Sequence, residues 1–93
     1  MTKTDLIEEV ARDVETTLKE SGVIVEAIFD EIMRALRVSD KVEIRGFGSF
    51  RIRQRQSRVA RNPKSGAHVD VPARKIPYFR PGKALREVVN AAK

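Results

Sequence analysis

The strongest restriction on the fold comes from the segment at residues 46–66, GFGSFRIRQRQSRVARNPKSG. It begins as a half-buried strand, because Phe50 and Ile52 are apolar while arginine occupies every odd position in 51–55. Successive side chains of a strand point to opposite faces, so the pattern predicts one dry face and one face with a row of guanidinium groups. After Arg55 the apolar alternation stops, although the cationic residues continue. The strand is therefore expected to extend beyond the core.

A turn and a returning strand follow this segment. The sequence RNPKSG has turn chemistry throughout, since proline presets φ, asparagine and serine bond the local backbone, and glycine allows a left-handed residue. Val69 and Val71 then share one face of the returning strand, whereas Pro72 and Pro77 lack the N–H group that a central strand needs. The sequence thus predicts an extended hairpin, or arm, over about residues 53–76, with a bent, edge-like return limb.

The first part of the chain indicates two amphipathic helices, because apolar residues recur there at three- and four-residue spacing. Thr2 is a plausible N-cap for the first helix, and Thr17 begins a T-L-K-E capping box for the second. Ser21 is an alternative N-cap, since Gly22 weakens a helix by roughly 1 kcal/mol relative to alanine. The two apolar stripes consist of Leu6, Ile7, Val10, Ala11 and Val14, and of Val25, Ile28, Phe29, Ile32, Met33 and Leu36.

The second part indicates a small antiparallel sheet and a final helix. Val42 and Ile44 have the parity of the apolar residues in the arginine-bearing strand, and a Gly-Phe-Gly turn separates the two strands. We expect an α+β fold in a single domain at residues 1–93, with two N-terminal helices, a three-stranded antiparallel sheet with an extended β-ribbon arm, and a short C-terminal helix near residues 83–89. The aromatic residues expected in the core are Phe47, Phe50, Tyr78 and Phe79.

The size of the core predicts an intertwined dimer. Without the arm, roughly 70 residues remain, fewer than a single core usually needs for comfortable stability. The chain has no cysteine, so disulfides cannot compensate. The apolar stripe of the second helix is also wider than one such core can cover. We therefore expect an obligate dimer whose core is shared between two copies.

Charge is segregated along the chain. Residues 1–41 contain 6 Lys/Arg and 10 Asp/Glu, a net charge of −4, whereas residues 42–93 contain 13 and 3, a net charge of +10. This asymmetry points to a polyanion as the partner of the second part. No apolar run approaches the roughly 18 residues of a membrane span, and the N-terminus lacks the features of a signal peptide. The expectation is a cytoplasmic protein without a membrane partner.

The motifs MTKTDLIEEVA, GFGSF, RNPKSG and PYFRPGKAL resemble those of the bacterial HU/integration host factor family of DNA-bending, histone-like proteins, over nearly the whole chain. GFGSF alone is a weak signal, but its combination with RNP-x-[ST]-G and F-R-P-G-K is highly specific. The resemblance implies an intertwined dimer whose two arms wrap around the DNA minor groove. It also implies that Pro63, at the arm tip, inserts between base pairs and kinks the duplex. From spacing alone, Pro63 is equally well explained as a turn proline.

The function that the resemblance implies is architectural: minor-groove binding that bends or wraps double-stranded DNA and compacts the nucleoid. An HU-like homodimer is the first interpretation. A subunit of an integration host factor-like heterodimer with sequence preference stays open, because Arg45 precedes Gly46 where HU usually has an apolar residue, and Ala60 replaces a common glycine. An RNA-binding module is less favoured, since the aromatic residues fit the core better than a base-stacking platform.

An enzyme is not expected. His68 is the only histidine, with Asp70 two residues on, and two such groups do not make a metal site. No set of nucleophile, base and acid can be assembled, so no cofactor, metal or small-molecule substrate is expected. The candidate DNA contacts, of which Pro63 is also the candidate intercalating residue, are Arg45, Arg53, Arg55, Arg58, Arg61, Asn62, Pro63, Lys64, Lys75, Arg80 and Lys83.

Overall fold

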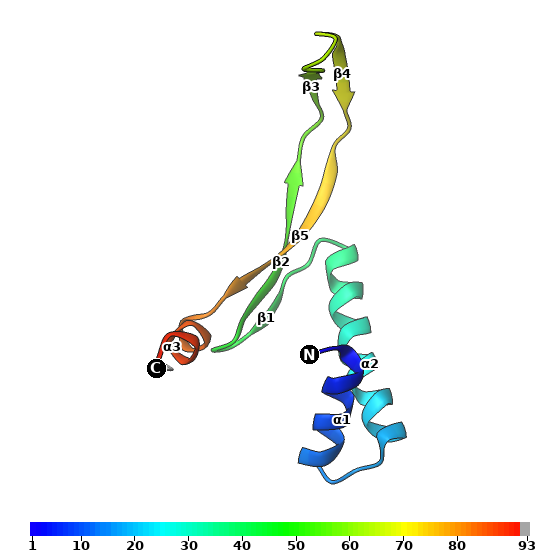
Figure 1. Cartoon of the computed structure of the whole chain (residues 1–93), viewed down its shortest axis with the longest axis vertical. Coiled ribbons are helices and arrows are strands. Elements are labelled where there is room, and N and C mark those ends of the chain that lie inside the picture. Colours follow the sequence, from blue (N-terminus) through cyan, green and yellow to red (C-terminus); the bar gives the residue numbers. More distant parts are fainter. Residues whose placement is uncertain (92–93) are drawn as a thin grey trace.

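The computed structural model describes residues 1–91 and has an elongated shape, with extents of 59 × 35 × 27 Å. The helices and the larger sheet gather at one end, and a ribbon of two strands, β3 (Arg58–Arg61) and β4 (His68–Val71), extends from them to the other end (Figure 1). Within residues 1–91, none of the helices combines the length and apolarity that crossing a membrane requires. The elements are α1 (Lys3–Asp13), α2 (Leu18–Arg37), β1 (Val42–Ile44), β2 (Gly48–Arg55), β3 (Arg58–Arg61), β4 (His68–Val71), β5 (Arg74–Pro81) and α3 (Lys83–Ala91). The predicted α+β fold is confirmed.

Both N-terminal helices begin at the predicted threonines. Thr2 Oγ1 accepts a hydrogen bond of 3.1 Å from the backbone N–H of Asp5, whose carboxylate accepts one of 2.9 Å in return. Thr17 Oγ1 accepts a 3.1 Å hydrogen bond from the backbone N–H of Glu20 in the first turn of α2. The predicted capping box is only half formed, because the Glu20 carboxylate accepts its hydrogen bond from the hydroxyl of Thr16. Ser21 as an alternative N-cap is wrong. It lies inside α2 and is fully buried. Its hydroxyl donates a 2.7 Å hydrogen bond to the carbonyl of Ile7, which links α2 to α1.

The strands β1, β2 and β5 form an antiparallel sheet in that order. The pairing of β2 with β5 runs from Gly48–Pro81 to Arg55–Arg74, so β5 is an edge strand, where the missing N–H of Pro77 is tolerated. We call the face of this sheet that is turned toward α2 the inner face. It carries Val42, Ile44, Phe50, Ile52, Pro77 and Phe79, and the rings of Phe50 and Phe79 lie 4.9 Å apart.

The turn between β1 and β2 depends on two glycines, as its sequence predicts. Gly46 has a φ of 82°, which favours glycine. At Gly48, an added Cβ would lie 2.5 Å from Cζ of Phe79 and 2.6 Å from the carbonyl oxygen of Arg80. The turn also binds the start of α3, because the N–H of Leu85 donates a 3.1 Å hydrogen bond to the carbonyl of Gly46. Close packing at Gly48 therefore joins β2 to β5.

A single chain buries little of its apolar surface. Among the apolar side chains of residues 1–91, only Ala11 and Val25 are buried. On α2, by contrast, Phe29 is 38% exposed and Met33 is 59% exposed, although both belong to the predicted core stripe. Part of the apolar stripe of α2, which includes Phe29 and Met33, is thus left uncovered within one chain.

The two glycines Gly48 and Gly22 should respond oppositely to alanine. Gly48→Ala is expected to lower the free energy of unfolding by about 1–3 kcal/mol, because the methyl group would overlap the Phe79 ring and the Arg80 carbonyl. Gly22→Ala is the control. Its Cβ would meet Ile7 at an ordinary 4.0 Å, and alanine favours a helix over glycine by about 1 kcal/mol. Urea unfolding at one fixed protein concentration should show midpoints shifted in opposite directions. An unchanged midpoint for Gly48→Ala would contradict the close packing of β2 on β5.

Candidate nucleic-acid interface

The outer face of the sheet, which is turned away from α2, carries a row of arginines. The register places Arg51, Arg53 and Arg55 of β2 beside Arg74 and Arg80 of β5, which confirms the predicted separation of a dry face from a guanidinium face. Arg55 and Arg74 are direct cross-strand partners. Like charges directly opposite each other destabilise a sheet. The outer face is therefore a surface that a bound anion would stabilise.

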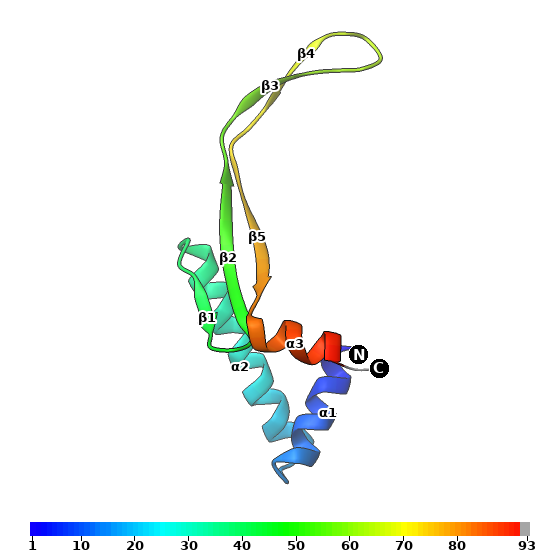
Figure 2. The same ribbon diagram turned by 90° about the vertical axis from the view of Figure 1, so that its left-hand side faces the viewer.

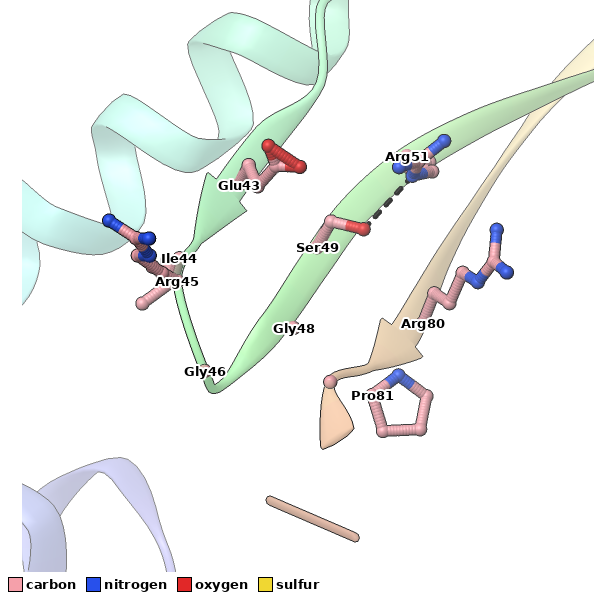
Figure 3. A pocket seen from close by; sticks show the side chains of 10 residues that line it. Glu43, Ile44, Arg45, Gly46, Gly48, Ser49, Arg51, Arg80 and Pro81 are labelled. Carbon is pink, nitrogen blue, oxygen red and sulfur yellow. Dashed lines mark hydrogen bonds between the residues drawn. The ribbon is translucent and has the colours of Figure 1, made fainter. Parts of the chain in front are cut away.

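A hollow of about 510 Å³ lies at the base of the outer face, where β1, β2 and β5 meet. Arg51 and Arg80 stand on neighbouring strands beside it, and Arg45 lies across the turn (Figure 3). Nε of Arg51 donates a 2.9 Å hydrogen bond to Oγ of Ser49, which is only 5% exposed. Glu43 of β1 adds a carboxylate to the lining. The hollow is cationic along its rim, with a hydroxyl that fixes the direction of one guanidinium.

Tyr78 lies on the outer face, so its assignment to the core was wrong. It stands directly opposite Arg51, and the guanidinium carbon of Arg53 lies 4.9 Å from the centre of its ring. The reason is alternation: Phe79 packs inward on Phe50, and its neighbour in the strand must then point outward.

Lys75 differs from the other predicted contacts of the sheet because it lies on the inner face. It pairs with Gln54, and its Nζ donates 2.8 Å to the carbonyl oxygen of Arg37 at the end of α2. A cation at this place satisfies a free helix carbonyl and interacts favourably with the helix dipole. In this structure Lys75 links the base of the arm to α2, and its contact with DNA stays a prediction.

The outer part of the arm is a separate two-stranded ribbon. The strands β3 and β4 pair from Arg58–Val71 to Arg61–His68, and the ribbon continues away from the helices beyond β2 and β5 (Figure 2). Val69 and Val71 share one face, as predicted, because they pair with Ala60 and Arg58. The ribbon therefore presents cationic and apolar side chains together.

A break in strand pairing separates the ribbon from the sheet on both limbs. Residues 56–57 on one limb and residues 72–73 on the other belong to neither β-ladder. We call these four residues the joint. Pro72 accounts for part of the break, since it has no N–H to donate to a ladder. The bent return limb that the prolines predict is thus located at the joint.

The tip of the arm is a turn built around Asn62. Its Oδ1 accepts a 2.9 Å hydrogen bond from the N–H of Lys64, and its carbonyl accepts one of 2.7 Å from the N–H of Gly66. Gly66 has a φ of 73°, in the left-handed region that the motif predicts for it. Pro63 is exposed within this turn. The geometry agrees with a turn role for Pro63 and equally with a wedge.

The remaining predicted contacts lie along the arm and at the last helix. Arg58 and Arg61 belong to β3, and Lys64 is exposed at the tip. Lys83 is the first residue of α3, with Nζ at 3.8 Å from the carboxylate of Glu87. The outer row also contains two arginines absent from the predicted contacts, Arg51 and Arg74. The sequence could have predicted Arg51, because it alternates with the inward-facing Phe50. Arg74 could be placed on the outer face only once the register of β5 was known.

Comparison with known proteins identifies the family. The family described as "Bacterial DNA-binding protein" matches residues 1–90. The chain is 46% identical over 90 residues to DNA-binding protein HU of Staphylococcus aureus (strain COL), an alignment that covers 97% of this chain and 100% of the relative. DNA-binding protein HU of Geobacillus stearothermophilus shows the same identity and coverage.

Solved structures agree with this comparison. An Anabaena HU–DNA cocrystal structure aligns with a TM-score of 0.85 and 37% identity, covering 99% of this chain and 100% of the other. HU from Thermotoga maritima aligns with a TM-score of 0.69 and 32% identity, covering 96% and 98%. The chain belongs to the bacterial DNA-binding protein family and is an architectural DNA-binding protein. The resemblance drawn from its motifs is confirmed.

Proposed function

We propose that this protein binds the minor groove and bends or wraps double-stranded DNA, and that it compacts the nucleoid in the cytoplasm. The observation that carries the proposal is the outer row of arginines, in which Arg55 and Arg74 face each other across two strands. A phosphate between them would offset their repulsion, and each neutralised phosphate also releases counterions. A structural neighbour that was crystallised with DNA supports this reading.

In the proposed complex, the sheet and the arm have different tasks. The outer face binds backbone phosphates, while the ribbon of β3 and β4 follows the minor groove, where the enhanced negative potential favours arginines such as Arg58 and Arg61. Val69 on the same ribbon is 46% exposed and suits contact with sugars and base edges. Pro63 is the proposed wedge. Unstacking a base step costs a few kcal/mol, which the additional contacts of a bent duplex offset.

The exposed part of the apolar stripe of α2 supports a homodimer. A groove of about 660 Å³ lies between α2 and β1, and Ile28 and Ile32 line it together with Val42 and Ile44. A second copy that covers this groove would complete a core that one chain lacks. A heterodimer with a related subunit is the second candidate, because Arg45 follows the integration host factor pattern.

The proposed role needs no catalytic residue, metal or cofactor. An RNA-binding role is not favoured, because single-stranded RNA is recognised chiefly by aromatic side chains that stack on bases, and Phe50 and Phe79 pack against each other on the inner face. Competition between duplex DNA and RNA of equal length separates the two roles.

The shared core predicts that Phe29→Ala unfolds the protein as well as dissociating it. A buried phenylalanine contributes roughly 3–5 kcal/mol, a large part of the stability of a domain this small. Sedimentation should show a dimer of the unchanged protein at low micromolar concentration, and circular dichroism should show loss of structure in the variant. A folded, monomeric Phe29→Ala protein would be incompatible with a shared core.

The outer row predicts a steep salt dependence of DNA binding. Log K should fall with log salt by about 0.9 for each phosphate neutralised. The double variant Arg55→Ala/Arg74→Ala should therefore lower the slope by about 0.9, because the two arginines share one phosphate. It should also melt at a higher temperature without DNA, because the cross-strand repulsion is gone. Lys75→Ala tests the predicted contact on the inner face, where an unchanged slope would assign Lys75 to α2 alone. An affinity for DNA that hardly changes between 50 and 200 mM salt would exclude binding through phosphate contacts.

The tip predicts that Pro63→Ala separates bending from binding. This variant should keep most of the salt-sensitive binding to straight duplex, because its cationic residues are intact, but should lose bending and the preference for nicked DNA. Arg55→Ala/Arg58→Ala is the matched comparison and should weaken binding to all duplexes alike. Fluorescence energy transfer between the ends of a short duplex, at saturating protein, measures the bend. If Pro63→Ala compacts the duplex as fully as the unchanged protein does, the tip is only a turn.

A further inference from the structure

Tyr78 occupies an unusual place for an aromatic residue of this sheet. It stands on the outer face, between the inward-facing Pro77 and Phe79, and directly opposite Arg51. It is half-buried. The guanidinium carbon of Arg53 lies 4.9 Å from the centre of the Tyr78 ring, so this group shields part of the ring from solvent.

The contact between Tyr78 and Arg53 is compatible with phosphate binding by the arginine. A guanidinium group can stack on an aromatic face and still present its fork of N–H donors to a phosphate. The ring attracts the cation through its quadrupole. Arg53 itself is exposed and therefore accessible to a ligand that approaches the outer face.

Arg51, the neighbouring arginine of the outer row, is also oriented by a side chain of the sheet. Arg51 is held by the hydrogen bond from its Nε to the nearly buried hydroxyl of Ser49. Two consecutive arginines of the outer row are thus oriented by side chains of the sheet, before any ligand arrives. Orienting a long side chain in advance lowers the entropy that is lost when it binds.

We propose that Tyr78 is a positioning residue for DNA binding, which holds the guanidinium of Arg53 in the orientation that receives a backbone phosphate. This proposal rests on the proposed DNA-binding function. In this role Tyr78 affects DNA binding only through Arg53 and does not contact DNA itself. The effect of removing the ring should consequently depend on the presence of Arg53.

A double-mutant cycle tests this dependence. Tyr78→Leu and Tyr78→Thr remove the ring, Tyr78→Phe keeps it, and each is made with and without Arg53→Ala. Affinity for a short duplex is measured by fluorescence anisotropy at two salt concentrations, and the folded state by thermal melting. With Arg53 present, both ring-free variants should bind about 2- to 5-fold more weakly, which corresponds to an exposed cation–π contact. Tyr78→Phe should bind like the unchanged protein.

In the Arg53→Ala background, the ring-free variants should bind no more weakly than the background protein. Ile76→Ala is the control, because Ile76 lies on the same outer face, directly opposite Arg53, and has no ring. Its effect on affinity should be the same in both backgrounds. If Ile76→Ala couples to Arg53 as strongly as Tyr78→Leu does, general packing explains the effect and the proposal fails.

Four further outcomes are decisive. If loss of the ring weakens binding equally without Arg53, Tyr78 contacts DNA directly and the positioning role is overturned. If Tyr78→Phe binds as weakly as Tyr78→Leu, the hydroxyl group is responsible and the proposal is again overturned. A protein that shows no salt-dependent DNA binding at all would refute the proposed function itself. Salt-dependent binding without any effect of Tyr78 would refute the positioning role alone.

Discussion

The rest of the structure depends on the two-residue alternation that β2 and β5 share. One backbone ladder sends Phe50 and Ile52 toward α2 and sends the guanidinium groups to the opposite side. A shift of the register by one residue would exchange the two faces, placing arginines against α2 and phenylalanine in water. Glycine at position 48 permits this pairing, because an added Cβ would lie 2.6 Å from the carbonyl oxygen of Arg80. Core formation and the cationic surface are therefore two results of one pairing.

Most of the fold could be predicted because its signals are local: threonine caps, apolar periodicity, glycine turns and the arginine alternation each act within a few residues. The errors concern features that depend on distant partners. Tyr78 and Phe79 are adjacent, so only one of them can face inward, and the pairing with β2 decides which. Ser21 fits a helix cap by its type, but its real partner is the carbonyl of Ile7 on another helix. The hydrogen bond of Lys75 to the end of α2 also depends on tertiary structure, while its contact with DNA stays a prediction.

Segregation of charge complements the geometry. The acidic residues concentrate in the part of the chain that forms α1 and α2, and the basic residues in the part that forms the sheet and the arm. Some helix acids are paired locally, as in the contacts of Glu26 with Lys3 and of Glu31 with Arg34. A polyanion is thus attracted to the sheet and the arm and repelled from the helical end, which gives its approach a direction.

The alternation of faces along the ribbon of β3 and β4 limits how arms of this kind can change in length during evolution. Because strand faces alternate, each limb can gain or lose residues only in even numbers without exchanging the two sides of the ribbon. Two added residues lengthen a limb by about 6.6–6.8 Å, which matches the rise of roughly two base pairs along one DNA strand. Arm length is therefore expected to change by two residues per limb at a time, and each such change spans about two base pairs of the duplex.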